Sequence, residues 1–156
     1  MKHVIAFAFL LAASVPALAQ WEYNNSTDKM SGDEQRMASA TSKNKLNLGF
    51  PYQDSNNRAR ISIMRAGKKA TRVLFGITKG QLNLSSDTSL MRVRFDDEKP
   101  EYWRCAPTDG HDSCFFVDTT KMIAKLKKAK KAMFDVLLYR MTGDIMEFEV
   151  AGLKWE

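Results

Sequence analysis

The middle of the sequence holds three consecutive carboxylates, Asp96, Asp97 and Glu98, that could carry chemistry. Glycoside hydrolases use two carboxyl groups held at a defined separation on either side of the scissile bond. Successive residues at the end of a strand point in different directions, however, and a solvated acidic turn is the commoner meaning of such a run. We therefore expect an acidic turn here and assign no catalytic residue, with hydrolysis by this cluster as the alternative.

A histidine, His111, lies in a polar stretch downstream of these carboxylates. A serine or cysteine nucleophile needs a neighbouring base, but the sequence has no Gly-x-Ser-x-Gly, P-loop or dinucleotide-binding motif around it. A metal site would need Asp109 and Asp112 to complete the ligands, and their spacing matches no standard zinc pattern. We expect no metal, no cofactor and no enzymatic activity.

The N-terminus has the pattern of a secretory signal peptide, which we place at residues 1–19. Residues 4–13 are apolar, and Pro16 precedes an A-x-A cleavage motif at residues 17–19. The apolar stretch is too short for a stable membrane anchor, and no later stretch is long enough. We expect export to the periplasm, with secretion as the alternative, and no membrane segment after cleavage.

The two cysteines, Cys105 and Cys114, both follow the signal peptide. An even number of cysteines in an oxidising compartment is typical of disulfide bonding. We therefore expect the two to be bonded to each other. The closed loop would contain about ten residues, and the chain-entropy model gives about 2–3 kcal/mol of stabilisation for a loop of that length.

Basic residues outnumber acidic ones, with 24 Lys and Arg against 18 Asp and Glu and a formal net charge of +6. In an exported protein this balance favours lipopolysaccharide, phospholipid headgroups or acidic protein faces as partners over nucleic acid. Some basic residues lie on the outer face of an expected strand, others on one side of an expected helix. The alternative is a solvated face with cross-strand ion pairs. The candidate binding residues are Arg92, Arg94, Lys121, Lys127 and Lys128.

Short alternating segments must position these residues. Residues 60–65 and 71–77 alternate apolar and polar side chains around a turn that contains glycine, which predicts a β-hairpin. Residues 90–96 alternate in the same way, with the two candidate arginines on the outer face. Residues 24–35 are polar and predict a loop, whereas residues 132–140 have apolar side chains on both faces, which predicts a strand buried on both sides.

One helix is expected late in the chain, at about residues 119–130, with an apolar stripe on one side and lysines on the other. Together with seven to nine short strands, it predicts a mainly β fold. The arrangement is an antiparallel β-sandwich or flattened barrel with the helix across one end. We expect a signal peptide at residues 1–19 and a single β-sandwich domain at residues 20–156. We make no prediction of the oligomeric state.

Several motifs, taken in their order along the chain, resemble a broad set of small exported bacterial β-sandwich proteins, largely uncharacterised, which includes type VI secretion-associated periplasmic proteins. The resemblance covers most of the chain after residue 19. It implies a periplasmic β-sandwich without known catalysis and transfers no functional residues. The motifs are Phe50-Pro51-Tyr52, the isoleucine-rich strand after it, Gly80-Gln81, Val93-Arg94-Phe95-Asp96, the lysine-rich helix, Tyr139 with Gly143, and Gly152-Leu153-Lys154-Trp155.

Charge, compartment and fold together favour a non-catalytic binding or accessory protein of the bacterial envelope. We expect it to recognise an anionic envelope component or a protein partner through a basic face. The alternative is an inhibitor or immunity-type protein that blocks an exported enzyme through a loop.

Overall fold

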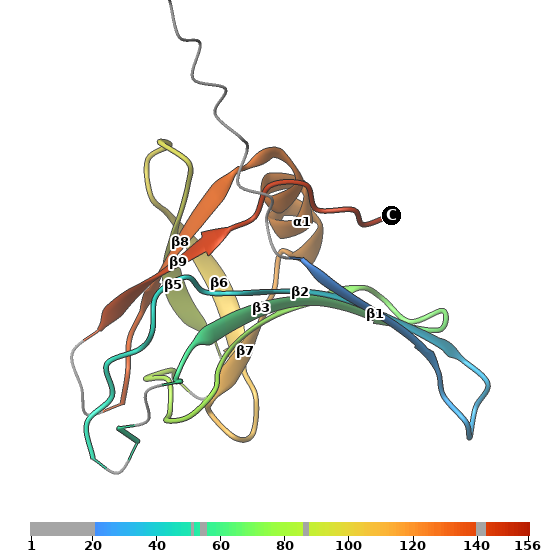
Figure 1. Cartoon of the computed structure of the whole chain (residues 1–156), viewed down its shortest axis with the longest axis horizontal. Helices are drawn as coiled ribbons and strands as arrows, with labels where there is room; N and C mark the ends of the chain where they lie inside the picture. The colour runs from blue at the N-terminus through green and yellow to red at the C-terminus, as the bar shows by residue number, and fades with distance from the viewer. Residues whose placement is uncertain (1–20, 51, 54–55, 86–87, 140–142) are drawn as a thin grey trace, which may run out of the picture.

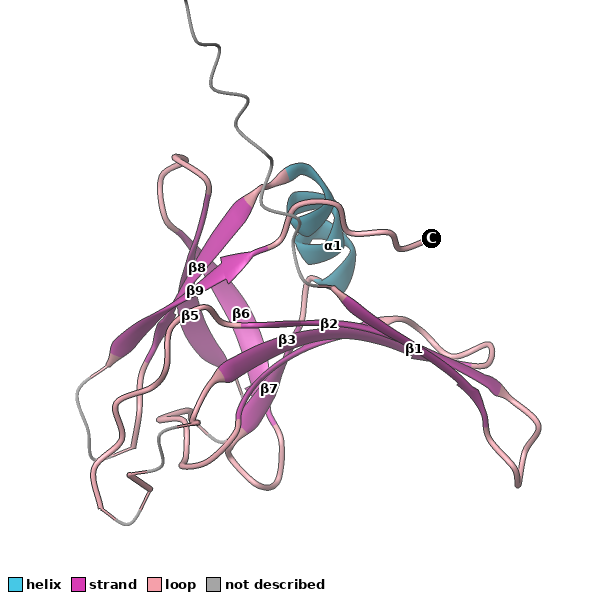
Figure 2. Cartoon of the chain, viewed as in Figure 1, coloured by secondary structure: helices cyan, strands magenta, loops and turns pink. Residues whose placement is uncertain are grey.

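The computed structural model describes residues 21–50, 52–53, 56–85, 88–139 and 143–156, so the predicted signal peptide lies outside the described residues. The described chain forms strands joined by turns and loops, with a helix between two of the strands late in the sequence (Figure 2). In chain order the elements are β1 (Glu22–Thr27), β2 (Glu34–Thr41), β3 (Ala59–Ala66), β4 (Arg72–Ile77), β5 (Ser89–Phe95), β6 (Glu101–Pro107), β7 (Ser113–Phe116), α1 (Thr119–Lys128), β8 (Lys131–Val136) and β9 (Asp144–Glu149).

The nine described strands belong to one antiparallel sheet in the order β1-β2-β3-β4-β7-β6-β5-β8-β9. The sheet bends over the core, and α1 lies on the inner side of the bend (Figure 1). No ladder joins β1 to β9, so the described sheet is open. The mainly β fold with one late helix is confirmed, and the single bent sheet is closer to a flattened barrel than to two separate layers.

The two edges of the sheet differ in how they end. The segment after β2 covers the β9 edge, where the Lys43 amide donates to the Glu147 carbonyl at 2.7 Å. The Asn44 side chain donates to the Ile145 carbonyl at 2.8 Å and accepts from the Glu147 amide at 2.9 Å. At β1, no described segment other than β2 makes a backbone hydrogen bond to the strand.

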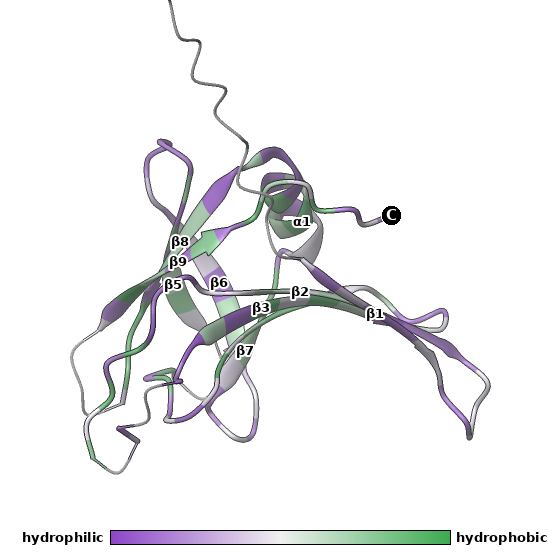
Figure 3. Cartoon of the chain, in the orientation of Figure 1, coloured by the Kyte–Doolittle hydropathy of each residue, from purple (hydrophilic) through white to green (hydrophobic). Residues whose placement is uncertain are grey.

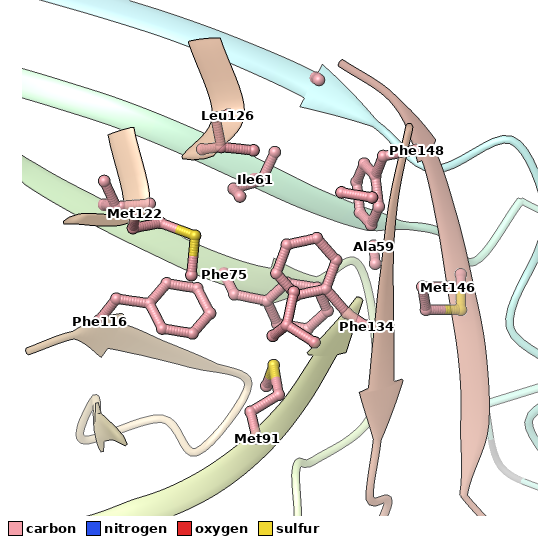
Figure 4. Packing of buried hydrophobic residues seen from close by; sticks show 14 of the residues in the cluster. Ala59, Ile61, Phe75, Met91, Phe116, Met122, Leu126, Phe134, Met146 and Phe148 are labelled. Atoms are coloured by element: carbon pink, nitrogen blue, oxygen red, sulfur yellow. The ribbon is translucent and has the colours of Figure 1, made fainter. Parts of the chain in front are cut away.

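The core lies inside the bend and is rich in aromatic side chains (Figure 4). The Phe75 and Phe134 rings stack with their centroids 5.2 Å apart, and Phe148 meets Phe134 edge-on at 5.3 Å. Met122 and Leu126 extend from α1 into the same cluster and are fully buried. Burying side chains of this size stabilises the fold by about 1.5–3 kcal/mol each, so packing fixes the helix against the sheet.

Helix α1 starts where the sequence predicts and ends slightly earlier. Ala129 is already extended, and the Asp96 carboxylate accepts the next two backbone amides, from Lys130 at 2.9 Å and Lys131 at 2.8 Å. Asp96 itself has a φ of 47°, in the left-handed region that aspartate tolerates better than most residues. Asp96 therefore joins the end of the helix to the start of β8. No described helix is long and apolar enough to cross a membrane.

The prediction of a loop over residues 24–35 is wrong, because β1 runs to Thr27 and β2 begins at Glu34. The hairpin they form is largely hydrophilic (Figure 3). Its strands pair residue by residue from Glu22 with Ser39 to Thr27 with Glu34. Cross-strand pairing, and not apolar alternation, therefore defines these strands.

The segment at residues 132–140 is also less buried than its sequence predicts; residue 140 lies outside the described part. Phe134 and Val136 of β8 are fully buried, but Leu137 and Tyr139 just beyond the strand are 53% and 49% exposed. The outer side of this part of the sheet has no covering layer in the described chain, because α1 packs only on the inner side.

Candidate functional site

The two candidate arginines lie on the outer face of β5, since they alternate with core residues of that strand. Arg92 forms an ion pair with Asp135 of β8, with its Nη2 atom 2.6 Å from Oδ2. Arg94 has no ion-pair partner among the described residues, and its Nε atom is buried without a hydrogen bond. One of the two arginines is therefore compensated and the other is not.

The candidate lysines belong to α1, on the opposite side of the sheet from these arginines. Lys121 Nζ lies 3.1 Å from a Glu101 carboxylate oxygen and 4.5 Å from the centre of the Trp103 ring. Lys128 lines a shallow depression next to the acidic turn after β5. Lys127 lines a hollow together with residues of the C-terminal segment, and no ion pair joins it to another described residue. The five candidate residues therefore do not form one continuous face.

The predicted acidic turn is engaged in structural contacts. Asp96 binds the backbone after α1, and Glu98 forms an ion pair with Lys125. Lys125 also lies 3.1 Å from Glu101. Hydrogen bonds from Lys121 and then Lys125 hold the pKa of Glu101 below its ordinary value. These carboxylates attach α1 to the sheet and do not converge on a common substrate position.

The disulfide prediction is wrong in this structure, where both cysteines are free and buried. Cys105 pairs with Phe116 across β6 and β7, and Cys114 pairs with Pro107. The cysteines are thus diagonal neighbours, with an expected Cα separation of about 7–8 Å, whereas a disulfide usually needs about 4.4–6.8 Å. Interaction between the two thiols lowers the pKa of Cys105 and raises that of Cys114.

His111 is an exposed turn residue with a φ of 54°. Its backbone amide donates to the Thr108 carbonyl at 3.0 Å, and its carbonyl accepts from the Leu82 amide at 2.7 Å. Among the described side chains, no three of the His, Cys, Asp and Glu type gather as a metal site would require. The hydrogen bonds of the His111 amide and carbonyl are backbone bonds that hold a turn.

A hollow of about 530 Å³ opens between β1, β2 and β3 on one side and α1 and the C-terminal segment on the other. Helix α1 and the C-terminal segment lie on the same side of the sheet (Figure 1). One acidic residue, Glu156, lines it. The other charged residues in its wall are basic and come from four separate parts of the chain. We call this region the basic hollow and define it by Tyr23, Arg36, Arg65, Lys127, Lys154 and Trp155.

Arg36 and Arg65 stand directly opposite each other on β2 and β3. Ala38 and Ile63, two residues further along these strands, form a fully buried pair. Arg36 and Arg65 therefore lie on the same side of the sheet as the core, just outside it. Arg36 donates to both carboxylate oxygens of Glu34, from Nε at 2.9 Å and from Nη2 at 3.2 Å, and its Nη1 lies 4.0 Å from Glu156. Arg65 has no ion-pair partner among the described residues. Like charges directly opposite destabilise a strand pair. Glu34 offsets the charge of Arg36, so an anion in the hollow would chiefly compensate Arg65.

Two aromatic residues flank these cations. The Tyr23 hydroxyl accepts the Lys154 backbone amide at 2.8 Å, which holds the C-terminal segment over β1. Trp155 is half-buried, and its Nε1 atom is shielded from solvent without a hydrogen-bond partner. The basic hollow thus combines positive charge with aromatic surface.

Of the cations of the basic hollow, Lys127 was predicted from the sequence as a candidate binding residue. Arg36 and Arg65 carried a usable signal, because each continues the apolar side of an alternating strand. Their pairing could not be seen without the strand register. The sequence matches no known protein family, and no curated protein or solved structure is found to be similar to it.

Proposed function

We propose that this protein is a non-catalytic periplasmic binding protein whose basic hollow recognises an anionic group on an envelope component. The observation that carries this proposal is the opposed pair Arg36 and Arg65, which shares a hollow with Lys127 of α1. A phosphate or carboxylate bound there would compensate the charge of Arg65, which has no ion-pair partner among the described residues, through charge-assisted hydrogen bonds. Such bonds are among the stronger polar contacts in proteins.

The aromatic residues narrow the class of ligand. Tyr23 is 48% exposed, and the half-buried ring of Trp155 lies in the same wall. Such rings offer apolar faces and a polar edge. They suit a ligand in which the anionic group is attached to a body with both apolar and hydroxyl surface, such as a phosphorylated saccharide or a phospholipid headgroup.

A non-catalytic role is supported by the positions of the carboxylates near α1. Asp96, Glu98 and Glu101 each have a defined partner in a backbone amide or a lysine. General acid–base catalysis needs a carboxyl group that can reach the substrate proton. These three hold the helix in place, so the proposal assigns them to the scaffold.

Binding to lipid vesicles tests the proposal directly. The purified chain is sedimented with vesicles of phosphatidylglycerol, with neutral phosphatidylcholine vesicles, and with lipopolysaccharide, at low and at high salt. Each basic residue near an anionic surface contributes about 1 kcal/mol, so Arg65→Glu should lower the affinity for the anionic target by about tenfold or more. Higher salt should weaken the wild-type interaction in the same direction.

Lys99→Glu is the matched control, because Lys99 is exposed in the β5–β6 turn and the change alters the net charge equally. It should change the affinity by less than about twofold, since the substitution lies outside the basic hollow. Binding to phosphatidylglycerol alone, or to lipopolysaccharide alone, distinguishes the two sources of the anion. Equal losses from both substitutions, or equal binding to neutral vesicles, would contradict the proposed site.

A further inference from the structure

A second surface, independent of the basic hollow, lies on the outer side of β6, β5, β8 and β9. Tyr102, Arg92, Asp135 and Ile145 form one row across these four strands. Tyr102 is 68% exposed and Ile145 is 48% exposed. Large apolar side chains that gather on one face of a soluble protein mark interaction sites more often than isolated ones do.

Two further leucines extend this surface beyond the row. Leu90 precedes Arg92 by two residues on β5 and is 59% exposed, and Leu137 follows Asp135 by two residues and is 53% exposed. Side chains two residues apart on a strand share a face. We call this surface the outer sheet face and define it by Leu90, Arg92, Arg94, Tyr102, Leu137 and Ile145.

A shallow depression of about 220 Å³ lies within the outer sheet face, between Arg92, Arg94 and Met133. Asp135 compensates the charge of Arg92, as described above. Arg94 has no ion-pair partner among the described residues, and Met133 lies between it and Glu147 in the next row of the sheet. Within the described chain, the depression therefore holds one guanidinium without an ion pair beside the apolar side chains of Pro100, Met133 and Ile145.

We infer that the outer sheet face docks a protein partner that presents a carboxylate flanked by apolar side chains. The carboxylate binds the Arg94 guanidinium, and its apolar neighbours cover Leu90, Tyr102 and Ile145. Tyrosine, methionine and arginine are the residue types enriched at the centres of protein interfaces. A charge-assisted pair shielded by apolar contacts also gives such an interface its orientation.

A displayed library of random peptides is the probe for this inference. Selection on the intact exported chain should enrich peptides with Asp or Glu between apolar residues. Their affinity, measured by fluorescence polarisation, should fall by about tenfold or more on Arg94→Glu, because like charges then meet in the interface. It should stay within about threefold on Arg94→Lys, which keeps the charge.

Tyr102→Ala provides a second variant that leaves the fold intact, since this side chain is largely exposed. It should weaken the selected peptides, whereas Arg65→Glu in the basic hollow should not. Circular dichroism confirms that each variant is folded. Enriched peptides without an acidic residue, or peptides that bind Arg94→Glu equally well, overturn the inference. Dimerisation of the chain that Leu137→Asp abolishes would also overturn it, because a second copy would then occupy this face.

Discussion

The basic hollow and the outer sheet face are assembled in different ways. The outer sheet face consists of residues on adjacent strands, and its register places Asp135 beside Arg92, where the two charges cancel. The basic hollow brings together β2, β3, α1 and the C-terminal segment, and its cations exceed its acids. In the outer sheet face the strand register pairs opposite charges, whereas in the basic hollow the β2–β3 register pairs two arginines and the packing of α1 and the C-terminal segment adds Lys127 and Lys154. Unbalanced charge at such a junction is the better indication of a ligand site.

The largest expected effect comes from the residue that attaches α1 to the sheet. Asp96→Ala removes the acceptor for the Lys130 and Lys131 amides and leaves alanine in a left-handed conformation. The free energy of unfolding, measured by urea denaturation, should fall by about 2 kcal/mol. Because α1 forms one wall of the basic hollow, vesicle binding should weaken, while peptide binding to the outer sheet face should not.

Asp96→Asn is the matched control for this prediction. Asparagine keeps an acceptor oxygen at the same position and tolerates a positive φ. Its loss of stability should be less than half that of the alanine variant. An alanine variant as stable as the wild type would show that the Asp96 carboxylate does not hold α1 against the sheet. The basic hollow would then depend on Asp96 no more than the outer sheet face does.

A smaller change in the free energy of unfolding, opposite in sign for the two variants, should distinguish Arg65 of the basic hollow from Arg92 of the outer sheet face. Arg65→Ala removes a like-charge neighbour of Arg36 and should leave the free energy of unfolding unchanged or raise it by about 0.5 kcal/mol. Arg92→Ala breaks the partly exposed pair with Asp135 and should lower it by about 0.5–1 kcal/mol. Both variants lose one charge, so urea denaturation at equal ionic strength compares them directly. Losses of the same size would show that the arginines of the basic hollow are already compensated.

The smallest effect concerns pH. The pKa of Glu101 is held below its ordinary value of 4.5 by hydrogen bonds from Lys121 and Lys125. A lowered pKa in the folded state gives stabilisation that is present above the unfolded pKa and lost as pH falls through the folded one. The urea midpoint of the wild type should therefore fall more steeply below about pH 4.5 than that of Glu101→Gln. Parallel curves would indicate that Glu101 does not hold α1 through its charge.

Most of the fold follows from alternation in the sequence, because a strand with one buried face must repeat with a period of two. The hairpin of β3 and β4 and the inward side of β5 were predicted in this way and are confirmed. The β1–β2 hairpin was missed because its strands extend past the core and have little apolar surface to alternate. The disulfide was predicted from the number of cysteines and the expected compartment. Neither reveals the β6–β7 register, which places the two cysteines diagonally across the strand pair.

The candidate site was less predictable, for a related reason. Lys127 was found because helical periodicity shows which side of a helix faces solvent. Arg36 and Arg65 are 29 positions apart in sequence, and only the β2–β3 register places them opposite each other. The position of Trp155 beside Lys127 depends on how the C-terminal segment crosses the helix, and local sequence pattern does not encode that crossing.

The side chain of Asn44 has a consequence for assembly. An open sheet can grow into a fibre when the first strand of one molecule pairs with the last strand of the next, and natural sheets guard their edges against this. Here the last strand already has its backbone groups at Ile145 and Glu147 occupied by Lys43 and Asn44. The β1 strand of another molecule would therefore find these two residues of β9 already paired, which opposes pairing of β1 with β9 between molecules. The Lys43 backbone and the Asn44 side chain thus guard one edge of a sheet that is open in the described chain.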